Sequence, residues 1–203
     1  MTGADSGGEG TARTACLVVD CQVDFCPGGS LAVEGGDRVA AGITRRLGRR
    51  PAGDPLVVAS RDWHLDPAGH FAAEGSPPDY VTTWPPHCVA GTPGAEYHPA
   101  LRVQPDVEVR KGAHAAAYSA FEGETEDGRS LLDVLRGAGV EEVQVCGIAT
   151  DHCVRATALD ARRLGFRVVL LGDLCAGVSP ETTSAALQEM SAAGVEIAGG
   201  REG

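Results

Sequence analysis

Val143-Gln-Val-Cys-Gly-Ile-Ala-Thr-Asp-His-Cys-Val-Arg-Ala-Thr-Ala-Leu-Asp-Ala-Arg-Arg-Leu164 is the stretch of the chain that decides its fold. Its opening run, Val143 to Gly147, is short, apolar and β-branched, which is typical of a buried strand. The continuation from His152 to Leu164 has the spacing of a helix that buries one face. A strand that leads directly into a helix is the repeating unit of α/β proteins.

The same unit recurs on both sides of this stretch. Further strands are predicted at Ala15 to Asp20, Leu56 to Ser60, Val107 to Arg110, Val168 to Leu171 and Val195 to Ala198. Further helices are predicted at Gly36 to Leu47, Ser130 to Ala138 and Pro180 to Ala193, with Ser130 and Ser179 as N-terminal cap signals. This order predicts an α/β fold: a doubly wound, mainly parallel sheet with helices on both faces.

Length and composition indicate the domain organisation. The chain has 203 residues, of which 43% are hydrophobic, which is enough for one substantial core and short for two. We therefore expect a single domain from residue 14 to residue 203. It follows a flexible tail, residues 1–13, that is rich in glycine and poor in apolar side chains.

Charge and cysteine usage exclude several classes of protein. The net charge of -11 argues against binding to nucleic acid or to an anionic membrane. No apolar run approaches the ~20 residues of a membrane span, and the first residues do not resemble a secretion signal. We therefore expect a soluble, cytoplasmic protein. Seven cysteines at irregular spacing do not suggest a disulfide framework, so reduced thiols are expected.

Four polar side chains follow the ends of four predicted strands. Asp20 ends the first strand, Asp62 follows the second, Lys111 follows the third, and Cys153 lies just past the strand of the opening stretch. Ligands of open parallel sheets bind outside the carboxyl ends of the strands. We therefore expect these four groups to converge on one site.

Cys153 is the candidate nucleophile of this site. It lies where a strand gives way to a helix. Backbone amides at such a point stabilise an anion, which is expected to lower the pKa of the thiol and to supply donors for a developing oxyanion. The alternative is an inert, packed thiol. We prefer that alternative for the cysteines in or beside strands, namely Cys16, Cys21, Cys146 and Cys175.

Asp20 and Lys111 are the candidate base and cation. Asp20 ends an apolar strand, where partial desolvation raises a carboxyl pKa toward that of a useful base. Asp24 is its rival, although its place in a loop favours structural hydrogen bonding. Lys111 is the only lysine among the 17 basic residues, which indicates a position where a compact ammonium is needed. The alternative role for Asp20 is to cap the loop that follows it. The alternative for Lys111 is an ordinary surface position.

A set of histidines and a carboxylate suggests a metal site. Asp62 and His64 lie two apart in an extended segment and would point the same way, and His87 could fold back to join them. Imidazole and carboxylate ligands suit Zn, Fe or Mn. The spacing is neither a zinc-finger nor a metalloprotease signature, so ordinary loop histidines stay an alternative. The long connections Asp62 to Gln104 and Gly112 to Arg129 are of a length that is usually functional.

Three sequence blocks point to a known family. They are Val19-Asp-Cys-Gln-Val-Asp-Phe-Cys-Pro-Gly-Gly-Ser-Leu-Ala-Val33, Trp84-Pro-Pro-His-Cys-Val-Ala-Gly-Thr-Pro-Gly-Ala95 and Gly147-Ile-Ala-Thr-Asp-His-Cys-Val-Arg155. Together they resemble the nicotinamidases, also called pyrazinamidases, of the isochorismatase-like cysteine hydrolase superfamily. The resemblance runs from about Leu17 to Glu196.

The resemblance implies roles for particular residues. A catalytic triad falls on Asp20, Lys111 and Cys153. The backbone amides of Ala149 and Cys153 form an oxyanion hole, aided by a cis peptide bond before Ala149. One divalent transition metal ion is implied, held by the residues matching Asp62, His64 and His87, with His70 as a fourth ligand in some members. Two departures, at Cys21 and at His114 with the three alanines after it, do not touch the triad.

The resemblance also implies the reaction. The expected enzyme hydrolyses nicotinamide, and analogues such as pyrazinamide, to nicotinate and ammonia through a cysteine thioester, as a step of NAD salvage, without a nucleotide cofactor. Candidates for the walls around a flat ring are Phe25, Trp84, Tyr118 and His152, with core packing as the alternative for each aromatic. A related amidase or carbamoyl hydrolase acting on another small amide is the alternative enzyme. Isochorismate hydrolysis is disfavoured because it cleaves a vinyl ether without using the cysteine, and a silent scaffold is disfavoured because the whole triad is present. A homo-oligomer stays open.

Overall fold

A computed structural model describes residues 13–51 and 55–199 of the chain. The predicted tail therefore lies outside the described residues, except for Arg13, which begins the first strand. The strands are β1 (Arg13–Val19), β2 (Leu56–Asp62), β3 (Val107–Lys111), β4 (Val140–Ile148), β5 (Arg167–Ala176) and β6 (Glu196–Ala198). The α-helices are α1 (Gly36–Leu47), α2 (Leu131–Gly137), α3 (Arg155–Arg163) and α4 (Pro180–Ala192). Short turns are η1 (Val23–Phe25), η2 (Pro93–Ala95), η3 (Ala120–Glu122) and the π-helical turn η4 (Thr150–Val154).

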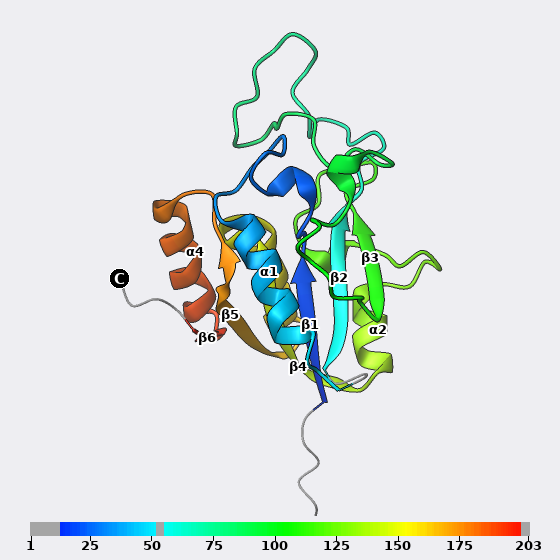
Figure 1. Ribbon diagram of the computed structural model, residues 1–203, viewed down its shortest axis with the longest axis vertical. Helices are drawn as coiled ribbons and strands as arrows, with labels where there is room; N and C mark the ends of the chain where they lie inside the picture. Colours follow the sequence, from blue (N-terminus) through cyan, green and yellow to red (C-terminus); the bar gives the residue numbers. More distant parts are fainter. Residues whose placement is uncertain (1–12, 52–54, 200–203) are drawn as a thin grey trace, which may run out of the picture.

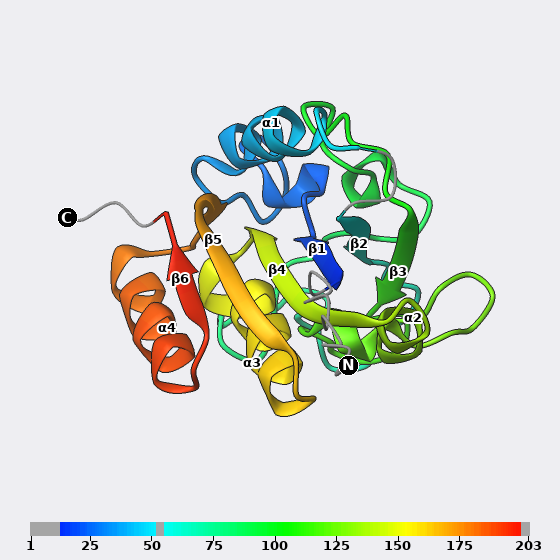
Figure 2. The same ribbon diagram turned by 90° about the horizontal axis from the view of Figure 1, so that it is seen from below.

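The described strands form one parallel sheet in the order β3-β2-β1-β4-β5-β6. The chain first adds β2 and β3 on one side of β1 and then crosses back to place β4 on its other side. This order reverses direction between β1 and β4, which is where doubly wound sheets open a crevice for a ligand. Helix α1 covers one face, and α2, α3 and α4 cover the other (Figure 2). The predicted fold class is confirmed.

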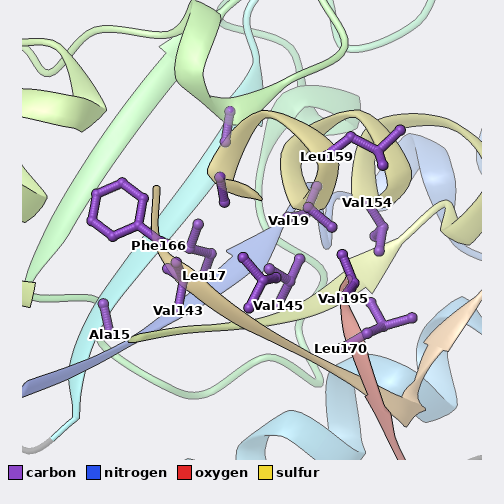
Figure 3. Close-up of a cluster of buried hydrophobic side chains, with 14 of the residues drawn as sticks. Ala15, Leu17, Val19, Val143, Val145, Val154, Leu159, Phe166, Leu170 and Val195 are labelled. Atoms are coloured by element: carbon purple, nitrogen blue, oxygen red, sulfur yellow. The ribbon is translucent and has the colours of Figure 1, made fainter. Parts of the chain in front are cut away.

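Both faces of the sheet are buried because the side chains of each strand alternate between two apolar layers. In β1, Ala15, Leu17 and Val19 face the layer beneath α3, whereas Cys16 and Val18 face the layer beneath α1. Figure 3 shows the first of these layers, with side chains of β1, β4 and β5 meeting those of α3. A sheet covered on both faces is rigid at its strand ends, which is what a site placed there requires.

Several strand and helix boundaries differ from the prediction. Strand β1 runs from Arg13 to Val19, β2 and β3 extend to Asp62 and Lys111, and β4 already begins at Val140. Strand β5 continues to Ala176 instead of ending at Leu171, because a register shift opposite β4 lets Cys175 pair with Gly147. The predicted helix from His152 to Leu164 begins instead with the turn η4, in which the Val154 amide bonds the Ala149 carbonyl five residues back. Turns of this π type are rare and are found mostly at functional sites.

The remaining local predictions agree with the structure. Helix α1 has the predicted bounds, and the Ser130 and Ser179 side chains cap α2 and α4 by accepting bonds from Asp133 and Thr182 amides. The two long connections carry only η2 and η3. Part of the first connection extends beyond the end of the sheet to which β1 points, at the top of Figure 1, whereas the second returns beside β3, where Glu124 pairs with Arg110. Among the described residues, no helix is both long and apolar enough to span a membrane.

Strands β1 and β4 approach closely where the site begins. Gly147 has a φ of +126°, and a Cβ built on it would lie 2.0 Å from the Val19 carbonyl oxygen. A side chain at this position would therefore force the two strand ends apart. The glycine lets the residues that follow β1 and β4 face each other.

Candidate active site

A lysine joins three acidic or nucleophilic side chains at the carboxyl end of the sheet. The Lys111 ammonium, at the end of β3, lies 2.9 Å from Asp20 Oδ2, 3.6 Å from Cys153 Sγ and in hydrogen-bond contact with Asp62 Oδ1. It also donates to the Ala117 carbonyl at 3.3 Å. Four segments that are distant in sequence thus meet at one ammonium group, as the strand-end argument predicts.

Asp20 directly follows β1 and is one of the two carboxylates among the described residues that contact Lys111. It is fully buried, and its backbone adopts a left-handed conformation with φ 45°, which turns the chain sharply off the strand. Ser60 donates a hydrogen bond of 2.7 Å to its Oδ1. Burial raises the pKa of the Asp20 carboxyl above its ordinary value, against the opposing effect of the Lys111 ammonium. Asp20 therefore has the desolvated surroundings predicted for a base.

Cys153 lies in η4, within the first turn after β4, and its side chain is buried. The expectation of a lowered thiol pKa is wrong for the free protein. Burial raises the pKa of Cys153 well above its ordinary value, Lys111 opposes this, and the carboxylates of Asp20 and Asp62 add to it. The thiol is therefore neutral at rest and needs a base to take its proton. An Asp20 oxygen, an Asp62 oxygen and Cys153 Sγ all lie within 4.8 Å of one another.

The ammonium state of Lys111 follows from the same surroundings. Burial alone would lower the pKa of Lys111, but the carboxylates of Asp20 and Asp62 raise it well above its ordinary value. A permanent positive charge at this point balances the buried negative charges around it.

Three buried histidines form a second cluster beside the first. One ring nitrogen each of His64, His70 and His87 lies within 4.8 Å of the others. The Nδ1 atom of His64 lies 2.6 Å from the Gly112 carbonyl oxygen, and that of His87 lies 2.8 Å from the Pro85 carbonyl oxygen. The His64 and His87 rings therefore each donate the Nδ1 proton to a backbone carbonyl and leave the Nε2 lone pair free, which is the usual arrangement of metal-binding histidines.

The nitrogen atoms of this cluster meet the requirements of a metal site. His64 Nε2 and His70 Nδ1 are buried without a hydrogen-bond partner among the described residues, which is costly unless a further group binds them. Burial is the main reason why the pKa of His87 is lowered. Burial is also the main reason why the pKa of His70 is lowered to about 4. Neutral imidazole is the form that ligates transition metals.

Asp62 belongs to both clusters. Its Oδ1 contacts Lys111, while its Oδ2 lies 3.7 Å from His64 Nε2 and 3.9 Å from His87 Nε2. Burial favours its neutral form, but the Lys111 ammonium and His64 outweigh burial and hold the pKa of Asp62 well below its usual range. The structure therefore brings all four predicted metal ligands together, His70 included.

A cavity of about 510 Å³ opens above these groups. All four predicted wall residues line it, as do Asp62, His70, His87 and Cys153. Trp84 Nε1 donates to the Tyr118 hydroxyl at 3.1 Å, and the Tyr118 and His152 rings are stacked with centroids 6.3 Å apart. The cavity is thus lined by flat side chains together with two histidines of the cluster, His70 and His87.

Several lining residues were missed by the sequence analysis. They include the loop residues Leu31, Val33, Tyr80 and Val178, together with Ile148 at the end of β4 and Thr182 in α4. No local sequence signal distinguishes them from core or surface residues. Only the quoted sequence blocks, which contain Leu31, Val33 and Ile148, could have drawn attention to any of them.

The residues expected to form an oxyanion hole also border the cavity. The peptide bond between Ile148 and Ala149 is cis, as the resemblance implies, and both Ala149 and Cys153 line the cavity. Within η4, the His152 and Val154 amides bond the Ala149 carbonyl, each at 3.1 Å, whereas the amides of Ala149 and Cys153 are the predicted oxyanion donors.

The remaining cysteines and Asp24 have structural surroundings. Cys16, Cys21 and Cys146 are fully buried in the core, and Cys175 is partly buried against it. Asp24 accepts hydrogen bonds from the Cys88 amide at 2.8 Å and the Ser30 amide at 3.2 Å. Asp24 therefore ties two loops together, as its loop position suggests.

Comparisons with known proteins agree with this geometry. Residues 14–202 match the family model of the isochorismatase domain. The chain is 53% identical over 184 residues to the nicotinamidase/pyrazinamidase of Mycobacterium tuberculosis, covering 90% of this chain and 97% of that protein. A structure of an L. infantum protein in complex with nicotinate has a TM-score of 0.79 at 40% identity and covers 92% of both chains. The pyrazinamidase of Pyrococcus horikoshii in complex with zinc has a TM-score of 0.76 at 41% identity, covering 92% of this chain and 98% of that one.

Proposed function

The chain belongs to the isochorismatase family, and on that basis we propose that it is a nicotinamidase, which hydrolyses nicotinamide and analogues such as pyrazinamide to the carboxylate and ammonia. The observation that carries this proposal is the contact of Lys111 with Asp20 and with Cys153, which lines a cavity together with aromatic rings. A buried thiol, a base and a fixed cation are the components of a cysteine amidase. The nicotinate released is a precursor for NAD salvage.

The first half-reaction forms a thioester. Asp20 takes the proton of Cys153, and the thiolate attacks the carboxamide carbon of the substrate. The amides of Ala149 and Cys153 donate hydrogen bonds to the oxyanion of the tetrahedral intermediate. The intermediate collapses as Asp20 returns the proton to the leaving nitrogen, and ammonia departs. Lys111 keeps its charge throughout and stabilises the carboxylate and the thiolate in turn.

The second half-reaction hydrolyses the thioester. Asp20, again a carboxylate, takes a proton from a water molecule as that water attacks the acyl carbon. The second tetrahedral intermediate expels the thiolate, which regains its proton from Asp20. The product leaves as nicotinic acid, which loses its proton to water to give nicotinate, and the resting state is restored. The raised pKa of the Asp20 carboxyl suits a group that accepts and returns a proton in each half-reaction.

A divalent metal ion accompanies this site, and we propose that Asp62, His64, His70 and His87 hold it. Zinc fits these ligands, as do iron and manganese. When bound, the ion would supply a Lewis acid to which the ring nitrogen of the substrate could bind, directly or through water. Phe25, Trp84, Tyr118 and His152 orient the ring and exclude water from the reacting carbonyl.

The substrate assignment predicts a preference for aromatic amides. We expect the purified protein to release ammonia and nicotinate in equal amounts from nicotinamide, with kcat/KM at least about a hundredfold higher than for propionamide, because an aliphatic amide loses the contacts with the rings. Ammonia would be measured by a coupled assay and nicotinate by chromatography. Equal kcat/KM for the two amides would instead favour a general small-amide hydrolase.

The metal assignment predicts a specific loss of affinity. We expect His87→Ala to weaken zinc binding by about a hundredfold or more, since it removes a ligand and not merely a residue behind one. Binding would be measured by competition with a zinc chelator and by elemental analysis. His114→Ala is the matched control, because His114 is exposed and lies outside the cluster. Undiminished zinc binding by His87→Ala would contradict the assignment.

A further inference from the structure

Gln22 has an unusual position between the first strand and the metal-ligand segment. It is fully buried, two residues after Asp20. Its side-chain nitrogen donates to the Asp62 carbonyl at 2.8 Å and to the Ala95 carbonyl at 2.9 Å, and its side-chain oxygen accepts from the Asp62 amide at 2.9 Å. Two carbonyls and one N–H therefore determine which way the carboxamide points.

The Gln22 side chain takes the place of a missing strand. The pairing of β1 with β2 ends at Val18 and Ala59, whereas β2 continues to Asp62. On that side, the last residue of β2 therefore has no strand to bond. A carboxamide offers the same donor and acceptor as a peptide group, and the Gln22 carboxamide satisfies both the N–H and the C=O of Asp62.

The backbone of Gln22 is itself held in place. Its amide bonds the Asp20 carbonyl at 2.8 Å, and Gln22 forms an antiparallel bridge with Tyr97. The next amide, that of Val23, bonds the Glu96 carbonyl at 2.9 Å. The Gln22 side chain thus extends from a backbone that is held by hydrogen bonds, so its contact with Asp62 can fix the position of the Asp62 peptide.

The position of the Asp62 backbone matters to both halves of the site. One carboxylate oxygen of Asp62 contacts Lys111 and the other faces His64 and His87. A small rotation of the Asp62 peptide would move the first oxygen off the ammonium and the second off the histidine cluster. Metal sites are sensitive to the groups that hydrogen-bond their ligands, and removal of such a group typically costs about 10–100-fold in metal affinity or activity.

We propose that Gln22 is a positioning residue that holds Asp62 where one carboxylate can serve the Cys153–Lys111 pair and the metal ligands together. The inference rests on the proposed metal site and hydrolase function. Gln22 does not contact the substrate in this proposal. It acts on the site through its hydrogen bonds to the Asp62 peptide.

The test compares two substitutions of glutamine by methionine. Gln22→Met keeps the length of the side chain and removes all three hydrogen bonds. Gln144→Met is the control, because Gln144 lies within β4 and bonds Glu142 and Arg46. We expect Gln22→Met to bind zinc at least about tenfold more weakly than wild type and to lose kcat on nicotinamide by a similar factor, and Gln144→Met to match wild type in both. Excess zinc should restore part of the lost activity of Gln22→Met.

A purely structural role would give a different result. In that case Gln22→Met would lower the unfolding temperature while the zinc affinity and kcat of its folded fraction stayed within about twofold of wild type, and the proposal would be overturned. Gln22→Glu is the second variant, since it keeps the shape and the bond from the Asp62 amide but loses both donors. It should also weaken zinc binding.

The zinc titration is done without nicotinamide or any other substrate. It therefore tests the role of Gln22 in metal binding independently of the proposed hydrolase function. A wild type that binds zinc but releases no ammonia would refute the function alone. A Gln22→Glu variant with wild-type zinc affinity would overturn the role of Gln22 alone.

Discussion

Replacing Cys153 with alanine is expected to lower kcat for ammonia release from nicotinamide by about 10⁴-fold or more. The substitution removes the sulfur that would form the thioester, and no other described cysteine borders the cavity. Alanine suits the helical turn and fills most of the buried position, so the fold should persist. Initial rates of ammonia release, with circular dichroism to check folding, would measure the effect.

A matched cysteine tests whether the loss is specific. Cys146→Ala removes a fully buried sulfur from β4, the strand that leads to Cys153, but Cys146 faces the core. Its kcat should stay close to that of wild type, although it is expected to unfold at a lower temperature. Acid-quenched wild type should carry a nicotinoyl group on the peptide that contains Cys153. Substantial turnover by Cys153→Ala would eliminate the proposed nucleophile.

The second large effect is expected for Asp20→Asn, which should reduce kcat by about 10³-fold. The thiol of Cys153 is neutral at rest because burial raises its pKa, so catalysis depends on a group that takes its proton. Asparagine has the shape of aspartate, tolerates the left-handed φ of 45° at this position and can still accept the bond from Ser60. The loss should therefore report the missing base and not a rearranged backbone. Steady-state kcat and KM would be compared with wild type.

Asp24→Asn is the control for this experiment, since Asp24 is the rival carboxylate. Each Asp24 oxygen accepts a bond from a different loop amide, and asparagine can accept only one of them. We expect a free energy of unfolding lower by about 1–3 kcal/mol, with kcat reduced by less than about tenfold. Equal losses of kcat in the two variants would mean that Asp20 is not the distinctive base.

The strands, helices and caps could be predicted because their signals are local. Short β-branched runs bounded by turns, and apolar side chains at helical spacing, reflect burial on particular faces whatever the rest of the chain does. Helix α1 and the caps at Ser130 and Ser179 followed the prediction for this reason. The end of β5 did not, because its last residues, Cys175 and Ala176, pair with β4 only after a register shift, which no local pattern reveals.

The candidate site divides in the same way. Asp20, Lys111 and Cys153 could be selected from the sequence because each follows a strand, and parallel strands end at a common edge. The neutral state of the Cys153 thiol could not, since helix-end amides predict a lower pKa and only the depth of burial reverses it. Nor could Gln22 or the aliphatic walls of the cavity be identified, because their partners lie in distant loops.

The amino-acid sequence by itself determined the α/β fold, the strand-end location of the reactive groups and, through its three blocks, the resemblance to a family. Tertiary structure alone decided that His70 joins His64 and His87, that Asp62 serves two clusters, and that Gln22 completes the end of β2. The physical reason is the range of the interactions. Strand and helix signals arise from neighbouring residues, whereas the site depends on long loops whose conformations are set by contacts between segments far apart in the chain.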